Sequence, residues 1–365
     1  MEPELESREK RTARLLRESF LDLNDMSPTI LSEIGLVGDR LKLPHELPHF
    51  STLRSAYMAP SHENTDLMRA IINPIEGIPE KLDAGKPLTD KELFAAEAVI
   101  ALYGRPALLV QDDDFGMPPS SWAMLAFKRE EIKSVLPSVG RIEFTIPGLG
   151  HIGTGFLVGP ELIMTNRHVV KVFARHVDGV WKFIPFMGIQ IDFKEEKDRQ
   201  SPNEFRIVEI VGVHEEFDMG LLRVAPTGTK NTKLPKPLKL SAQGPEYLDE
   251  NEYVYVIGYP AKDEERNDPE ALVKIFENIY NCKRLQPGKL RGLKTVIHEG
   301  ASNQPVLLHD CSTLGGNSGS CLVDLATSRV IGLHYGGFYG QDNYAVPLWR
   351  LVEDPLLKSK GINFE

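Results

Sequence analysis

The chain has 365 residues, 41% of them hydrophobic and 26% charged, so it is long enough for two or three globular domains and unlike a disordered or fibrous protein. Its formal net charge of −10 argues against a broad nucleic-acid-binding surface, because phosphate binding needs clustered lysines and arginines. Three cysteines (Cys282, Cys311 and Cys321) are an odd, sparse set that favours buried thiols in a reducing compartment over a disulfide scaffold, although Cys311 and Cys321 could pair if oxidised.

The N-terminus is charged and has no apolar stretch of the kind found in secretory signals. No segment approaches the roughly 18 continuous apolar residues of a membrane span. We therefore expect a cytoplasmic protein without membrane or nucleic-acid partners.

Residues 1–137 are predicted to form a mainly helical regulatory or adaptor region. Apolar residues recur at helical spacing near residues 15–23, and a second helix runs from an N-cap candidate, Thr89, to Gly104. A third helix opens after Pro118-Pro119, and one short strand is expected within residues 105–115.

From about Ser138 the pattern changes to short apolar runs separated by turns, which predicts an all-β sandwich or a pair of barrels. A segment rich in lysine and proline, residues 225–245, would separate two β subdomains. The candidate strands are residues 140–146, 153–159, 161–166, 183–193, 206–213, 219–224, 253–259, 307–313, 320–325 and 330–337.

Three residues in this region suit nucleophilic catalysis. Ser318 lies in the glycine-rich turn GGNSG, His168 emerges at a polar corner after two apolar runs, and Asp218 precedes an apolar strand. A serine nucleophile needs a neighbouring base, an acid that orients the base, and backbone N–H groups aimed at the oxyanion. The order His, Asp, Ser is one of the known arrangements of this triad.

With "GTGFLV…TNRHVV", "FDMGLLRV" and "GGNSGS" in this order, the chain resembles the trypsin/chymotrypsin-like serine peptidases over about residues 139–355. The resemblance implies an all-β, chymotrypsin-like double β-barrel peptidase domain over residues 138–365, with a C-terminal helix. It also implies that His168 is the general base, that Asp218 orients it, and that Ser318 attacks the scissile carbonyl. The N–H groups of Gly316 and Ser318 would form the oxyanion hole.

A narrower resemblance, to the glutamyl endopeptidases, rests on "STLGGNSGS" and "VIGLHYGG". It implies that Thr313 and His334 bind an acidic P1 side chain, since a hydroxyl and an imidazolium can both donate to a carboxylate. The alternative is that these two side chains only satisfy each other. Ser312, six residues before Ser318, argues against cleavage after Lys or Arg. The backbone of residues 335–337 (Tyr335, Gly336 and Gly337) would pair with an extended substrate.

Asn317 stands where secreted relatives carry an aspartate that pairs with a freshly cleaved N-terminus, so that activation switch is not expected here. We expect instead that residues 1–137 control activity, through an activating protein partner that moves them.

Two other motifs are not expected to bind a metal. The segment HELPH at residues 45–49 matches the zinc-binding motif H-E-x-x-H, which requires a continuous helix. Pro44 and Pro48 make such a helix unfavourable. The acids of QDDDF at residues 111–115 are typical of a solvated turn. We predict no cofactor and no metal. Five further histidines are expected to be structural or surface residues: His151, His176, His214, His298 and His309.

Two alternatives compete with a serine endopeptidase acting on protein or peptide substrates. One is a catalytically silent peptidase fold that serves as a binding module, which the intact triad argues against. The other is an HtrA-type quality-control protease, which we do not favour because such proteases usually continue into a PDZ domain, whereas this sequence ends soon after residues 343–357.

Overall fold

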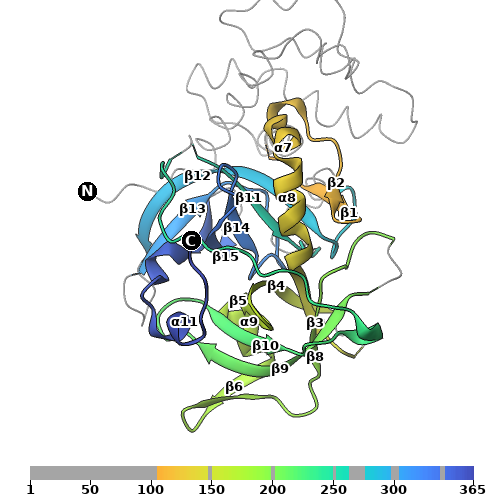
Figure 1. The fold of residues 1–365 in the computed structure, drawn as a ribbon, viewed down its shortest axis with the longest axis vertical. Helices are drawn as coiled ribbons and strands as arrows, with labels where there is room; N and C mark the ends of the chain where they lie inside the picture. Colours follow the sequence, from red (N-terminus) through yellow and green to blue (C-terminus); the bar gives the residue numbers. More distant parts are fainter. Residues whose placement is uncertain are drawn as a thin grey trace, which may run out of the picture.

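The structure is a computed structural model that describes residues 105–146, 150–198, 202–249, 252–262, 276–296, 304–337 and 342–365. Two antiparallel β-barrels make up most of it, one above the other in Figure 1. The predicted double β-barrel is therefore confirmed. The helices predicted within residues 1–104, the HELPH motif and His298 lie outside the described residues.

The first barrel closes from six strands in the order β10-β5-β4-β3-β8-β9. Its interior is apolar, and Ile142, Ile163 and Phe205 are fully buried there. Helix α9 (Arg167–Phe173) follows β5 and leads into the small hairpin β6 (Ala174–Val177) and β7 (Val180–Phe183). The barrel strands are β3 (Val139–Phe144), β4 (His151–Gly159), β5 (Leu162–Thr165), β8 (Ile189–Asp192), β9 (Glu204–Val213) and β10 (Gly220–Val224).

The second barrel closes in the order β11-β14-β15-β16-β13-β12, because β11 also pairs with β12. A 3-10 turn (Leu348–Leu351) and helix α11 (Pro355–Ser359) follow it, and the Asp354 side chain caps α11 by accepting from the Leu357 N–H. The strands are β11 (Tyr253–Gly258), β12 (Arg284–Val296), β13 (Gln304–His309), β14 (Cys321–Asp324), β15 (Val330–Gly337) and β16 (Asn343–Pro347).

Residues 105–138 pack onto the second barrel. Strand β1 (Leu108–Gln111) pairs with β12 and with β2 (Asp114–Phe115), so the single strand expected here is a hairpin, with Asp112 and Asp113 in its turn. The expected third helix is broken into a 3-10 turn (Ser120–Trp122), α7 (Met124–Phe127), α8 (Arg129–Val135) and a 3-10 turn (Leu136–Ser138). The break falls at Lys128, whose backbone leaves the helical region. The boundary after residue 137 stays a prediction.

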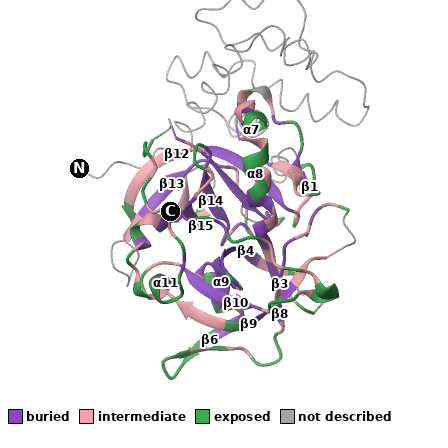
Figure 2. Cartoon of the chain, in the orientation of Figure 1, coloured by how far each residue is buried: buried purple, intermediate pink, exposed green. Residues whose placement is uncertain are grey.

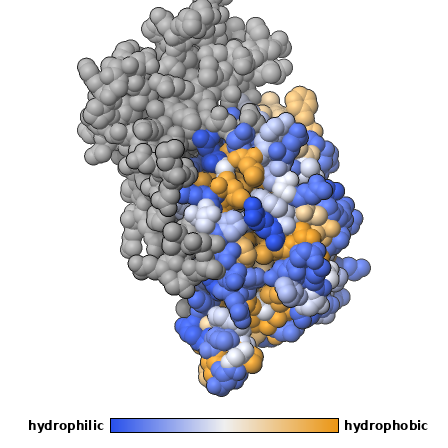
Figure 3. All heavy atoms as spheres, turned by 90° about the vertical axis from the view of Figure 1, so that its left-hand side faces the viewer, coloured by the Kyte–Doolittle hydropathy of each residue, from blue (hydrophilic) through white to orange (hydrophobic). Residues whose placement is uncertain are grey.

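Burial follows the barrels. Figure 2 shows purple, buried strands at the centre and exposed residues on the outer side of α8. Residues of α8 and the strands of both barrels share one apolar cluster, which includes Ile132, Met164 and Val323. On the face shown in Figure 3, apolar residues lie in separate groups among hydrophilic ones. None of the helices in the described part of the chain is long and apolar enough to cross a bilayer.

All three cysteines are free thiols. Cys311 and Cys321 are buried, and burial raises the pKa of Cys321 to about 12. The preference for two buried thiols over a disulfide is thus confirmed.

Lys283 is a fully buried lysine between the barrels. Its ammonium donates to the carbonyl oxygens of Leu136 (2.8 Å) and Phe193 (2.7 Å). Burial lowers its pKa from 10.5 to about 8, although nearby carboxylates act in the opposite direction. The folded state therefore releases this proton at lower pH than the unfolded state does.

Between pH 8 and 10.5 the unfolded chain binds more protons at Lys283, so this residue makes the free energy of unfolding rise with pH, by about 3 kcal/mol in total. We expect Lys283→Met to remove this rise, measured by urea unfolding at several pH values. Lys133→Met, a similar change at a half-exposed lysine of α8, should keep it. Identical pH profiles for wild type and Lys283→Met would contradict the assignment.

Candidate active site

His168 and Asp218 meet at one end of the first barrel. Strands β5 and β10 are antiparallel neighbours, with Thr165 opposite Gly220, so the residues that follow β5 and precede β10 lie at the same edge. Asp218 Oδ2 lies 2.6 Å from His168 Nδ1, and Asp218 Oδ1 accepts the backbone N–H of His168 at 2.9 Å. The carboxylate thus fixes both the ring and the backbone of the histidine.

This pairing also fixes the charge of Asp218. Burial alone would raise the pKa of its carboxyl, but the hydrogen bonds and charge of His168, with help from Arg167, hold the pKa below its usual value. The carboxylate is therefore ionised at neutral pH. It binds the Nδ1–H tautomer of His168, which leaves Nε2 as the basic nitrogen.

The turn before Asp218 has its own support. His214 Nδ1 accepts the backbone N–H groups of Glu216 and Phe217, both at 3.0 Å. Its Nε2 lies 3.0 Å from Asp354 Oδ2 at the start of α11. His214 is a structural residue, as expected, and it connects the Asp218 turn to the C-terminal helix.

Ser318 lies in a tight turn before β14 that depends on two glycines. Gly316 and Gly319 have φ of +86° and +91°, which L side chains rarely adopt. A Cβ on Gly319 would lie 1.9 Å from the carbonyl oxygen of Thr154, and one on Gly316 would lie 2.3 Å from His151 Nε2. Only glycine fits either position.

Two side-chain amides that bond to each other support the Ser318 turn. Gln286 Nε2 donates to Asn317 Oδ1 at 3.0 Å, and Asn317 Nδ2 donates to Gln286 Oε1 at 3.2 Å. Both side chains are fully buried. A neutral reciprocal pair satisfies both amides without burying a charge, so Asn317 holds the turn in place without an ionised partner.

Gly153 of β4 lies between the Ser318 turn and helix α9, which carries His168. A Cβ on Gly153 would lie 2.9 Å from both the Ser318 carbonyl oxygen and the Val169 side chain, and the Thr154 N–H donates to that carbonyl at 2.8 Å. Among the described residues, the hydroxyl of Ser318 makes one hydrogen bond, to the Tyr335 carbonyl at 3.5 Å. The His168–Asp218 contact is thus formed, whereas the serine hydroxyl is turned toward β15.

The backbone N–H groups of Gly316 and Ser318 take no part in the hydrogen bonds of the described residues. The carbonyls around them are engaged, because Ala261 donates to Gly315 O and Thr154 Oγ1 donates to Gly316 O. Two N–H groups in one fixed turn can bind an oxygen that gains negative charge.

Thr313 and His334 do not bond to each other, so the alternative that they satisfy only one another is wrong. Thr313 Oγ1 donates to Asn343 Oδ1 at 2.8 Å. His334 Nδ1 lies 3.1 Å from His309 Nε2, and both rings are buried. His309 is thus a residue of this site that the sequence did not reveal.

Burial, together with the charges of His309 and His168, holds the pKa of His334 well below its usual value. His334 is therefore a neutral imidazole in this structure, in place of the imidazolium expected from the sequence. Because the hydrogen bond to His309 uses Nδ1, Nε2 is the nitrogen of His334 that is left for a ligand.

Strand β15 offers backbone for a ligand beside Ser318. Tyr335, Gly336 and Gly337 follow the part of β15 that pairs with β14. Within the described residues Gly336 and Gly337 pair with β16, and Tyr335 lies at a register shift between the two strands. A Cβ on Gly336 would meet nothing within 4 Å. An extended peptide could pair with the open side of this segment.

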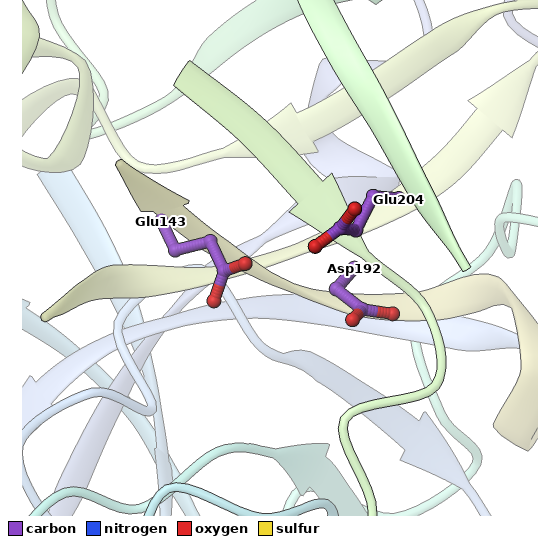
Figure 4. Close-up of side chains that lie close together, drawn as sticks. All are labelled: Glu143, Asp192 and Glu204. Atoms are coloured by element: carbon purple, nitrogen blue, oxygen red, sulfur yellow. The ribbon is translucent and has the colours of Figure 1, made fainter. Parts of the chain in front are cut away.

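One group of acids in the first barrel has the spacing of a cation site. Glu143, Asp192 and Glu204 lie on the adjacent strands β3, β8 and β9 (Figure 4). Internal donors already engage them: Gln190 Nε2 binds Glu143 at 2.9 Å and Glu204 at 3.0 Å, and Arg141 Nε binds Glu143 at 2.8 Å. Burial raises the pKa of Asp192. These contacts account for the cluster as a hydrogen-bonded network, and the expectation of no metal stays a prediction.

Comparison with known proteins adds to this geometry. Residues 153–333 match the trypsin-like peptidase domain family. A glutamyl endopeptidase of Staphylococcus epidermidis is 29% identical over 57% of this chain and 62% of its own length. One from Staphylococcus aureus (strain MRSA252) is 26% identical over 65% of this chain and 62% of its own length. The chain thus matches under two thirds of these relatives.

Among solved structures, the active form of the Rv3671c protease from M. tuberculosis is 20% identical and covers 64% of this chain and 85% of its own, with a TM-score of 0.42.

Proposed function

We propose that this chain, which belongs to the trypsin-like peptidases through residues 153–333, is a serine endopeptidase that cleaves protein or peptide substrates after acidic residues. The observation that carries the proposal is the two-point contact of Asp218 with His168. The name of the staphylococcal relatives supports the preference for glutamate.

In the proposed reaction the Ser318 side chain first rotates, so that its hydroxyl leaves the Tyr335 carbonyl and donates to Nε2 of His168. This nitrogen carries no hydrogen and accepts the proton. Ser318 Oγ attacks the scissile carbonyl carbon as His168 takes the hydroxyl proton, and Asp218 stabilises the imidazolium that forms. The N–H groups of Gly316 and Ser318 stabilise the oxyanion.

Collapse of this intermediate breaks the C–N bond, and His168 protonates the departing amine. A water molecule, deprotonated by His168, then hydrolyses the acyl-enzyme and restores Ser318.

The proposed P1 pocket combines the Thr313 hydroxyl with the His309–His334 pair. A carboxylate that enters this pocket loses water and needs donors in return. His334 Nε2 supplies one donor once its ring carries a hydrogen there, and the Thr313 hydroxyl supplies a second when it exchanges its present acceptor, Asn343 Oδ1, for the carboxylate. Residues 335–337 would hold the substrate backbone as an added strand.

Cleavage-site profiling on a peptide library tests this function. We expect Glu, and less strongly Asp, to be enriched at P1, because both carboxylates can reach the donors but Glu reaches further. Glutamine at P1 is the matched control, since it has the same shape without the charge. Enrichment of Arg, Lys or large apolar residues would contradict the pocket assignment while leaving the peptidase activity established.

One observation favours the binding module as a second candidate: the Ser318 hydroxyl contacts Tyr335 in place of His168. Catalytic hydrogen bonds often form only when substrate is bound, so this geometry does not decide against an enzyme. Covalent labelling of Ser318 separates the two candidates.

Control by the N-terminal region, an activating partner and an intracellular location remain parts of the proposal. The informative truncation removes residues 1–104, because residues 105–137 contribute β1 and α8 to the packed structure. Regulation through residues 1–104 requires that this truncation change activity or its response to a partner.

A further inference from the structure

Residues 310–313, which we call the pocket wall, form hydrogen bonds with Arg105 and with Asn343, and the two partners alternate along the segment. Asp310 and Ser312 bond to Arg105, whereas Cys311 and Thr313 bond to Asn343. Successive residues of an extended segment point to opposite sides, so one side of the wall is anchored by Arg105 and the other carries Thr313.

The Arg105–Asp310 pair is buried and makes two hydrogen bonds. Arg105 Nε lies 2.5 Å from Asp310 Oδ1, and Arg105 Nη2 lies 2.8 Å from Asp310 Oδ2. The side chains are 3% and 0% exposed. Two parallel hydrogen bonds fix the orientation of both the guanidinium and the carboxylate, whereas a lysine ammonium in the same place would fix neither plane.

Further contacts make this pair part of a rigid unit. Asp310 Oδ1 also accepts the Lys289 N–H at 2.8 Å, which ties it to β12. The Ser312 hydroxyl donates to the Arg105 carbonyl at 2.7 Å, and the Arg105 guanidinium lies 5.5 Å from the centre of the Trp122 ring. The wall is therefore bonded to both the side chain and the backbone of Arg105.

Arg105 lies outside the part of the chain that matches the peptidase family, residues 153–333. It directly follows residues 1–104 and precedes β1, which pairs with β12. Any displacement of the segment at residue 105 acts directly on the wall that carries Thr313.

We propose that Arg105 is a positioning residue for substrate specificity, which through Asp310 and Ser312 sets the P1 pocket wall and couples it to the preceding N-terminal region. The inference rests on the proposed function in placing P1 beside Thr313. It predicts that breaking the contact weakens substrate binding and P1 discrimination and leaves the chemistry at Ser318 intact.

The test is the full-length double variant Arg105→Met/Asp310→Leu. Removing one partner would leave a buried charge and risk unfolding, whereas replacing both with apolar side chains of similar size is often tolerated.

We expect KM for the best P1 peptide to rise about tenfold with a smaller change in kcat, and the ratio of kcat/KM for Glu over Gln at P1 to fall. The labelling rate with a small fluorophosphonate, which has no P1 side chain, should stay within about twofold. Ser312→Ala, which keeps the ion pair, should show a smaller effect in the same direction.

Arg129→Met is the matched control, because Arg129 pairs with Asp114 in the same segment and away from the pocket. It should leave KM and P1 preference unchanged. Wild-type KM and P1 preference in the double variant would overturn the inference. If the wild type prefers a residue other than Glu, the proposed acidic specificity fails, and the same comparison with the preferred residue still tests Arg105.

Discussion

Replacing Ser318 by alanine is expected to lower peptide turnover by about 10⁴-fold or more and to abolish labelling by a fluorophosphonate probe. The alanine lacks the oxygen that attacks the carbonyl, while the turn that carries it, fixed by Gly316 and the Asn317–Gln286 pair, does not depend on the hydroxyl. Thermal unfolding of the variant should therefore resemble that of the wild type.

His168→Ala and Asp218→Asn complete this test. Loss of His168 removes the base, and we expect turnover to fall about as far as in Ser318→Ala. Asp218→Asn keeps the shape of the side chain but favours the wrong tautomer of His168, and should cost about 10⁴-fold. Because these residues act as a unit, combining two of the changes should add little.

Ser320→Ala is the control within the same turn. Ser320 is buried two residues after Ser318, and its hydroxyl lies 3.4 Å from Asn317 Oδ1. Labelling of Ser318 should persist in this variant. Turnover that survives in Ser318→Ala would refute the nucleophile assignment, and a wild type that neither labels nor turns over peptides would favour the binding module.

The meeting of His168 and Asp218 was predictable because it depends on local patterns. Each of them adjoins a strand with a clear apolar run, and antiparallel pairing of these strands brings residues 50 positions apart into contact. The resemblance to the trypsin/chymotrypsin-like peptidases then implied the roles of the three residues. Sequence alone did not give the position of the Ser318 hydroxyl, which is set by rotation about one bond.

Strand β12 was missed because its sequence does not alternate. Pro287, Gly288 and several charged residues interrupt it, yet it pairs with β1, β11 and β13. Tertiary pairing overrides weak local propensity in such a strand. The broken helix at residues 120–138 is the opposite case, since one continuous helix was predicted there but the backbone leaves the helical region at Lys128.

Contacts between residues far apart in the sequence could not be predicted from local sequence patterns either. His309 contacts His334 across 25 positions, and Arg105 contacts Asp310 across 205. A lone histidine at a strand end and a lone arginine before a strand carry no spacing signal. The only hint is that a charged residue next to a buried strand usually needs a partner.

The pocket makes a prediction about pH. His334 is neutral in the empty pocket, so an acidic P1 side chain must bring about uptake of one proton if it is to face an imidazolium. His309 supports this step because its ring bonds to Nδ1 of His334, so the added charge lies within a hydrogen-bonded pair. Glutamine at P1 has no charge and requires no such proton.

We therefore expect the ratio of kcat/KM for Glu over Gln at P1 to fall as pH rises, by at most about tenfold per pH unit. The sign follows from the low pKa of free His334: binding Glu takes up a proton, and rising pH makes that proton less available. Using the ratio cancels the pH dependence of the chemical steps that both substrates share. Steady-state kinetics of two peptides that differ only at P1 measure it.

His334→Gln should remove both the preference for Glu and its pH dependence, a loss of about 10- to 100-fold in the ratio, because a neutral amide cannot take up the proton. His176→Gln is the matched control, since His176 is exposed and its ring contacts Trp181 at a tilted angle on the β6-β7 hairpin. A ratio that stays constant with pH in the wild type would mean that His334 donates as a neutral ring, and a preference that survives His334→Gln would place the acid-binding group elsewhere.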